Sequence, residues 1–134
     1  MRQDDYNKAQ LVTVGWRWGR EYGGYLPALM IMGCVANRVR CGWGSWLQVI
    51  ERIPHFTAED FESKEFPSVW EPGFVRLLHE VDGVYDNSGV DLSKGALYWA
   101  DLRRVTRTWF KENIIQRSDI HPRIVDCGSL VLFK

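Results

Sequence analysis

The sequence has few cysteines and no excess of charge of either sign. Among its 134 residues are three cysteines, Cys34, Cys41 and Cys127, an odd number without a CxxC pair. This pattern argues against a disulfide framework and a zinc ribbon, so we expect free thiols. Lys and Arg together number 17, as do Asp and Glu. A neutral chain has no net field to attract DNA, RNA or an anionic membrane, and we expect no nucleic-acid partner.

The sequence also lacks a segment that could cross a membrane. Its longest apolar run, residues 26–36, is too short to span a bilayer. Residues 1–5 are polar and contain no apolar core of a signal peptide. We therefore expect a chain made in the cytoplasm without stable membrane insertion, which another protein must deliver if its target lies outside.

Motifs for metal, phosphate or serine chemistry are missing as well. The histidines His55, His79 and His121 are scattered and form no HExxH pattern. There is no GxSxG motif and no glycine-rich phosphate loop. Arg103, Arg104 and Arg107 form a basic cluster, which we interpret as a solvated helix face. We expect neither a metal ion nor another cofactor.

The hydrophobic pattern predicts one mostly helical domain over residues 1–134. A first helix is expected over about residues 5–21, with Leu11, Val14 and Trp18 on one apolar stripe. A second begins at Pro27 and is apolar all round, which predicts a central buried helix. Further helices are expected at residues 45–53, 57–60, 72–84 and 106–115, and strands at 95–99 and at 124–133 with a turn or bulge at 127–128. The prediction is an α+β fold with a small antiparallel sheet in the C-terminal half.

Glu21 is the residue whose position most suggests chemistry. It lies seven positions after Val14 and three after Trp18, so on a helix it continues the apolar stripe. Poor solvation disfavours a charged carboxyl group and raises its pKa. An acid that keeps its proton near neutral pH can protonate the leaving group in glycoside cleavage. The alternative is a solvated glutamate at a helix end.

Four segments of the chain, in order, resemble a known family. Residues 21–24, Glu-Tyr-Gly-Gly, precede the buried helix and Asn37-Arg38-Val39. This arrangement resembles the cell wall hydrolase family typified by the spore cortex-lytic enzymes. Residues 47–57, 91–99 and 127–133 are similar to three further segments of that family. The motifs are individually weak, but they cover residues 10–134 in the right order.

The resemblance implies a lysozyme-like fold and cleavage of the β-1,4 bond between N-acetylmuramic acid and N-acetylglucosamine in peptidoglycan. Glu21 matches the family's catalytic glutamate. Several members are lytic transglycosylases, in which one glutamate acts as acid and then as base while a hydroxyl of the sugar closes an anhydro ring. A standard hydrolase needs two carboxylates. Asp101 is the best candidate for a second one, but we expect it to be structural, which favours the transglycosylase route.

The same comparison suggests which residues line the substrate groove. Tyr98 matches a tyrosine of the family, and His55 and Phe56 lie in the similar segment 47–57. Alternatively, these are a sheet aromatic and ordinary loop residues. Asn37, at the end of a buried helix, is expected to make structural hydrogen bonds. The family usually has Glu-Ala-Arg-Gly where this chain has Glu21-Tyr22-Gly23-Gly24, so we expect the change to affect substrate contacts more than the acid.

A catalytic domain without a wall-binding module suits a monomeric phage or prophage endolysin. Such a protein stays in the host cytoplasm until a holin, a membrane-permeabilising partner, releases it to the periplasm or cell wall. A virion-associated enzyme fits the sequence too. The alternative from a different class is a non-catalytic lysozyme-like protein that binds glycan or is a structural part of a phage particle.

Overall fold

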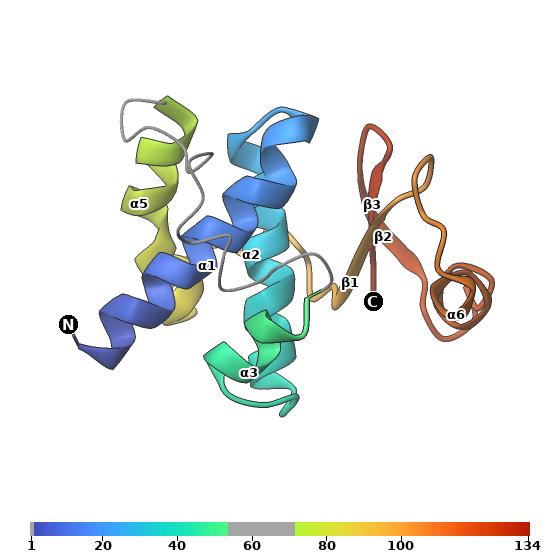
Figure 1. Cartoon of the computed structure of the whole chain (residues 1–134), viewed down its shortest axis with the longest axis horizontal. Coiled ribbons are helices and arrows are strands. Elements are labelled where there is room, and N and C mark those ends of the chain that lie inside the picture. Colours follow the sequence, from blue (N-terminus) through green and yellow to red (C-terminus); the bar gives the residue numbers. More distant parts are fainter. Residues whose placement is uncertain (1, 54–71) are drawn as a thin grey trace.

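The computed structural model describes residues 2–53 and 72–134, with Glu21 and Pro72 described by their backbone alone. The helices of the N-terminal half pack together, and the sheet lies beside them (Figure 1). The helical segments are α1 (Gln3–Gly19), η1 (Arg20–Tyr22), α2 (Tyr25–Arg40), α3 (Trp46–Glu51), α5 (Pro72–Tyr85), α6 (Thr108–Phe110) and η2 (Lys111–Ile115). The strands are β1 (Tyr98–Asp101), β2 (Arg123–Cys127) and β3 (Leu130–Phe133). The predicted α+β fold is confirmed.

The central element is α2, which is buried on nearly every side, as its all-round apolar sequence predicts. It crosses α1 at close range because glycines of α1 face it. A Cβ on Gly19 would lie 2.3 Å from the backbone nitrogen of Ala28, and one on Gly15 would lie 2.5 Å from Cγ of Met32. The crossing therefore requires the absence of side chains at both positions.

The predicted helix over residues 5–21 is two elements in the structure. The α-helix ends at Gly19, and residues 20–22 tighten into the 3₁₀ turn η1. Gly23 and Gly24 follow with φ of 116° and 89°, a backbone region that glycine enters without steric cost. These two glycines turn the chain back into α2.

Most other helix predictions are confirmed. Ser45 begins α3 through a capping box, in which its hydroxyl accepts from the Gln48 backbone and the Gln48 side chain accepts from the Ser45 backbone. The helix α5 covers the predicted residues 72–84. The helix expected over 106–115 begins at Thr108 and changes to a π turn at Lys111. The turn expected at 57–60 lies outside the described residues.

The sheet has three antiparallel strands in the order β1-β3-β2, with β3 buried along its length. Residues 124–133 form two strands joined by the turn predicted at residues 127–128, where Gly128 has a φ of 62°. The strand expected over 95–99 begins only at Tyr98. Lys94 and Gly95 have positive φ and the backbone of Ala96 bonds to Ser93, so a turn takes the place of the strand's first residues.

Asn37 joins α2 to this turn. Its side-chain amide donates to Oγ of Ser93 and to the carbonyl of Ala96, both at 2.9 Å. A Cβ on Gly33 would lie 2.7 Å from Oγ of Ser93, so Gly33 leaves the space that the turn occupies. The predicted structural role of Asn37 is confirmed.

The α1–α2 crossing generates a stability prediction. We expect Gly19→Ala to lower the free energy of unfolding by about 2 kcal/mol, because the new methyl group overlaps backbone atoms of Ala28. Chemical denaturation followed by tryptophan fluorescence measures the change. The matched control is Gly83→Ala, since a Cβ there would meet its nearest atom, in Gly89, at 3.4 Å. Equal stability of the two variants would contradict the prediction.

Candidate functional site

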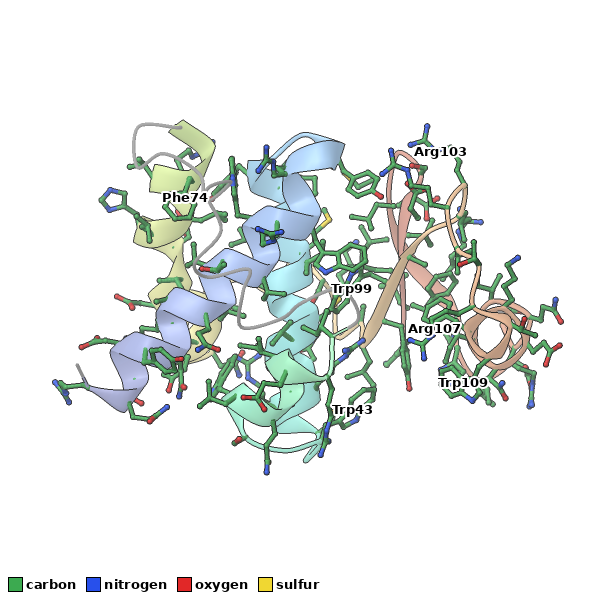
Figure 2. The ribbon with its side chains drawn as sticks, in the orientation of Figure 1. Trp43, Phe74, Trp99, Arg103, Arg107 and Trp109 are labelled. Atoms are coloured by element: carbon green, nitrogen blue, oxygen red, sulfur yellow. The ribbon has the colours of Figure 1, made fainter. Side chains whose placement is uncertain are left out.

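A groove of about 670 Å³ opens between the helices and the segment running from β1 to α6. Many of its walls are aromatic rings. The aromatic lining consists of Trp18, Tyr22, Trp43, Tyr98, Trp99, Trp109 and Phe110. Figure 2 shows Trp43 at the α3 end and Trp109 beside α6, with Trp99 between the helices and the sheet. The groove thus presents many flat apolar faces to a ligand.

Tyr98 lies in the lining of this groove, at the start of β1. Its ring is 5.5 Å from the ring of Trp43 and 5.1 Å from that of His121, measured between centroids. Contact with these two rings restricts the rotation of the Tyr98 side chain. A role of Tyr98 in binding substrate stays a prediction. His55 and Phe56, expected beside it, lie outside the described residues.

Glu21 lies in η1, and its neighbours in sequence border the groove. Tyr22 follows directly and Trp18 precedes it by three positions, and both side chains belong to the lining. The ring of Trp18 packs edge-on against Trp99, with centroids 5.8 Å apart. The structure therefore places the backbone of Glu21 beside the groove wall, while the raised pKa of its carboxyl group stays a prediction.

Asp101 holds η1 against β1. The hydroxyl of Tyr22 donates to its Oδ2 at 2.7 Å, and the backbone of Arg103 donates to its Oδ1 at 2.9 Å. Guanidinium nitrogens of Arg103 and Arg104 lie 3.5 and 3.6 Å from its oxygens. Burial acts to raise the pKa of Asp101, but the hydrogen bonds from Tyr22, Arg103 and Ser129 outweigh it and lower this pKa to about 2. These contacts agree with the structural role expected of Asp101.

Arginines add positive charge to the aromatic lining. Arg17, Arg38, Arg52, Arg104 and Arg107 belong to it. Arg104 and Arg107 are exposed, as expected of a solvated face, but the expected helix is wrong at these positions, because α6 begins only at Thr108. Both side chains border the groove. Residues 103–110, Arg-Arg-Val-Thr-Arg-Thr-Trp-Phe, combine three arginines with two aromatic residues within eight positions, which is a signal for a mixed surface of this kind. The sequence indicated this basic cluster, but not that its arginines meet Arg17, Arg38 and Arg52 at one groove.

Residues 2–53 and 72–134 contain neither a cluster of metal-binding side chains nor a membrane-spanning helix. No three or more His, Cys, Asp or Glu side chains come together there as metal ligands would. No helix there combines the length and apolar character that spanning a bilayer requires. The aromatic groove is therefore the candidate site.

The Asp101 contacts predict how stability depends on pH. The pKa of Asp101 is about 2 in the folded chain, below its ordinary value of 3.8. Its contribution is therefore complete above about pH 4 and is lost as pH falls through about 2. Because this side chain is only 4% exposed, we expect the loss to be about 2 kcal/mol.

Unfolding titrations of wild type and Asp101→Asn between pH 5 and pH 2 test this dependence. Wild type should lose more stability than the variant over that range, by about the amount given above. Asp119→Asn is the control, since Asp119 pairs with Arg117 on the exposed surface and should contribute little. Parallel curves for wild type and Asp101→Asn would contradict the assignment.

The comparisons with known proteins identify no relative. No protein-family model, curated protein or solved structure matches this chain. Its function must therefore be argued from the groove and from the residues that border it.

Proposed function

We propose that this protein cleaves the glycan strands of peptidoglycan, with Glu21 as the acid that protonates the glycosidic oxygen. The observation that carries the proposal is the aromatic groove beside the turn that contains Glu21. The apolar faces of sugar rings stack on aromatic side chains, and the groove volume of about 670 Å³ lies in the range of known ligand sites. The resemblance to the cell wall hydrolase family supports the same assignment.

The position of Asp101 favours a mechanism with one carboxyl group. Its two oxygens already accept hydrogen bonds from Tyr22 and from the Arg103 backbone, and two guanidinium groups adjoin them. A carboxylate held in this way is poorly placed to attack a sugar or to activate water. In the proposed reaction Glu21 donates its proton to the leaving oxygen, and its carboxylate then takes the proton of a sugar hydroxyl that closes an anhydro ring.

The proposal extends to the biological setting implied by the sequence. In that setting the protein is a monomeric endolysin of a phage or prophage, released to the wall by a holin. We also propose that the fold is lysozyme-like.

Glu21→Gln tests the role of the acid. We expect this variant to fold as wild type does and to clear a suspension of purified cell walls at least about 100-fold more slowly, since general acid catalysis contributes about 10²–10⁴ in rate. Glu80→Gln is the matched control, because Glu80 is exposed on α5. Clearing by Glu21→Gln at the wild-type rate would refute the proposed acid.

The products distinguish the transglycosylase from a hydrolase. We expect mass spectrometry of the digest to show anhydro-muramic ends, because the single-carboxyl route closes the ring within the sugar. Reducing ends without anhydro products would instead require a water nucleophile and a second group to activate it.

Trp109 tests the groove as the glycan site. This side chain is 56% exposed, so its removal should cost little stability. We expect Trp109→Ala to weaken glycan binding by about fivefold, which corresponds to about 1 kcal/mol for one stacked ring. Isothermal titration with glycan strands, carried out in the Glu21→Gln background to prevent cleavage, measures the affinity. Tyr6→Ala, which removes an exposed ring from α1, is the control. Equal affinities of both variants would place the glycan elsewhere.

A non-catalytic glycan-binding protein is the second candidate. The arginines and aromatic rings of the groove favour binding regardless of catalysis. This candidate predicts that wild type and Glu21→Gln bind cell walls equally well and that neither releases soluble fragments. Release of soluble fragments by wild type but not by Glu21→Gln would instead support the enzyme.

A further inference from the structure

We propose that the groove recognises a carboxylate on its glycan ligand and that Arg38 is the residue that binds it. The inference rests on the proposed glycan-binding function and names the class of glycan: an acidic strand, in place of a neutral polymer of N-acetylglucosamine.

Arg38 lies at the end of α2 and is held in a fixed position. Its Nε donates to the carbonyl of Leu97 at 2.7 Å. The central carbon of its guanidinium is 4.6 Å from the ring of Trp99, 5.0 Å from that of Trp43 and 5.7 Å from that of Tyr98. Three rings and one hydrogen bond thus orient the plane of the guanidinium group before any ligand arrives.

The charge of Arg38 has no carboxylate partner among residues 2–53 and 72–134 as described. Its Nε bonds to a neutral carbonyl, and the groups that act electrostatically on it are Cys34 and Tyr98. Burial lowers the pKa of Arg38 from its ordinary value, although a guanidinium keeps its charge in proteins. A partly desolvated cation without a counter-ion is costly, and attraction to the rings offsets only part of that cost.

The terminal amino groups of Arg38 have no acceptor in the described part of the chain, and the side chain belongs to the groove lining. Two parallel N–H donors in a fixed plane match the two oxygens of a carboxylate. A ligand carboxylate would therefore supply a negative charge and two acceptors that the described residues do not provide.

The rest of the groove has the same sign of charge. Asp101 is the one acidic residue among the described lining residues, and Arg103 and Arg104 already balance it. Arg52 donates to the carbonyl of Trp43 at 3.0 Å, and this hydrogen bond positions its guanidinium group at the α3 end of the groove. Arg107 stands at the α6 side (Figure 2). On a chain with no net charge, this concentration of cations favours an anion bound locally in the groove.

Peptidoglycan offers this chemistry on its muramic acid residues. Each one carries a lactyl group, whose carboxylate is free on strands without stem peptides. On strands that keep their peptides the lactyl group is an amide, and the carboxylates are those of the peptide. A carboxylate in either place fits the guanidinium, and strands of the two kinds distinguish the sources.

The test compares affinities of the Glu21→Gln protein, in which cleavage is prevented. Three soluble strands of equal length serve as probes: peptide-free strands, the same strands with the lactyl carboxylate converted to its methylamide, and strands with stem peptides. We expect the methylamide strands to bind about tenfold more weakly than the better of the two acidic strands, as loss of a charged hydrogen-bonded pair predicts. Which acidic strand binds more tightly identifies the source of the carboxylate.

Arg38→Gln in the same background should remove this difference between acidic and methylamide strands. The matched control is Arg76→Gln, because Arg76 also lies over an aromatic ring, 3.8 Å from the centroid of Tyr25, but belongs to α5. It should keep the difference. If Arg38→Gln fails to fold, the comparison of acidic and methylamide strands in the Glu21→Gln protein still tests whether the groove recognises a carboxylate. Arg107→Gln, at an exposed position of the groove, should then reduce the difference in affinity.

Several results would overturn the inference. These are equal binding of acidic and methylamide strands, a tenfold preference that survives Arg38→Gln, absence of binding to any strand, and tighter binding of a single-stranded oligonucleotide than of acidic glycan. Failure of the enzyme proposal is recognised separately. If wild type clears no cell walls but the carboxylate preference holds, the groove is an acidic-glycan site without catalysis. If wild type clears cell walls but acidic strands bind no more tightly than methylamide strands, the carboxylate inference is refuted and the enzyme proposal is not.

Discussion

The hydrogen bonds that Asn37 and Arg38 donate to the carbonyls of Ala96 and Leu97 join the helices to the sheet. Both donors lie in the last turns of α2, the buried centre of the helices, and both acceptors lie in the chain entering β1. The two elements meet there, and the groove opens along the contact. The position of α2 therefore determines where the aromatic residues of β1 face those of the helices.

A second connection ties the candidate acid to the same sheet. Tyr22 donates to Asp101 across 79 positions of sequence, and this bond holds η1 against the end of β1. The charge on Asp101 is stabilised by the surrounding donors, so the bond is maintained at neutral pH. One ionised carboxylate therefore helps to position the turn that carries Glu21. The chemistry proposed for Glu21 depends on that placement, because a misplaced acid loses much of its catalytic effect.

Local sequence patterns predicted the helices well. The all-round apolar pattern of α2, the capping residues Ser45 and Gln48 and the stripe of Leu11 and Val14 are properties of neighbouring residues, and each has the expected structure. The strands were harder to place. The strand β1 begins at Tyr98, three residues later than predicted. Asn37, which is distant in sequence, donates a hydrogen bond to the carbonyl of Ala96, and residues 93–96 form a turn. Pairing partners outside the local window decide such a boundary.

The amino-acid sequence alone was enough to predict the α+β class, the buried central helix and the structural role of Asn37, and to single out Glu21 as a candidate acid. It could do so because periodicity, capping and burial of polar groups act over a few residues. The sequence did not predict that Arg38 lies among Trp43, Tyr98 and Trp99, or that Arg107 borders a groove, because both depend on tertiary contacts. Those neighbours come from elements far apart in the chain, and the charge and shape of a binding site arise from where such elements meet.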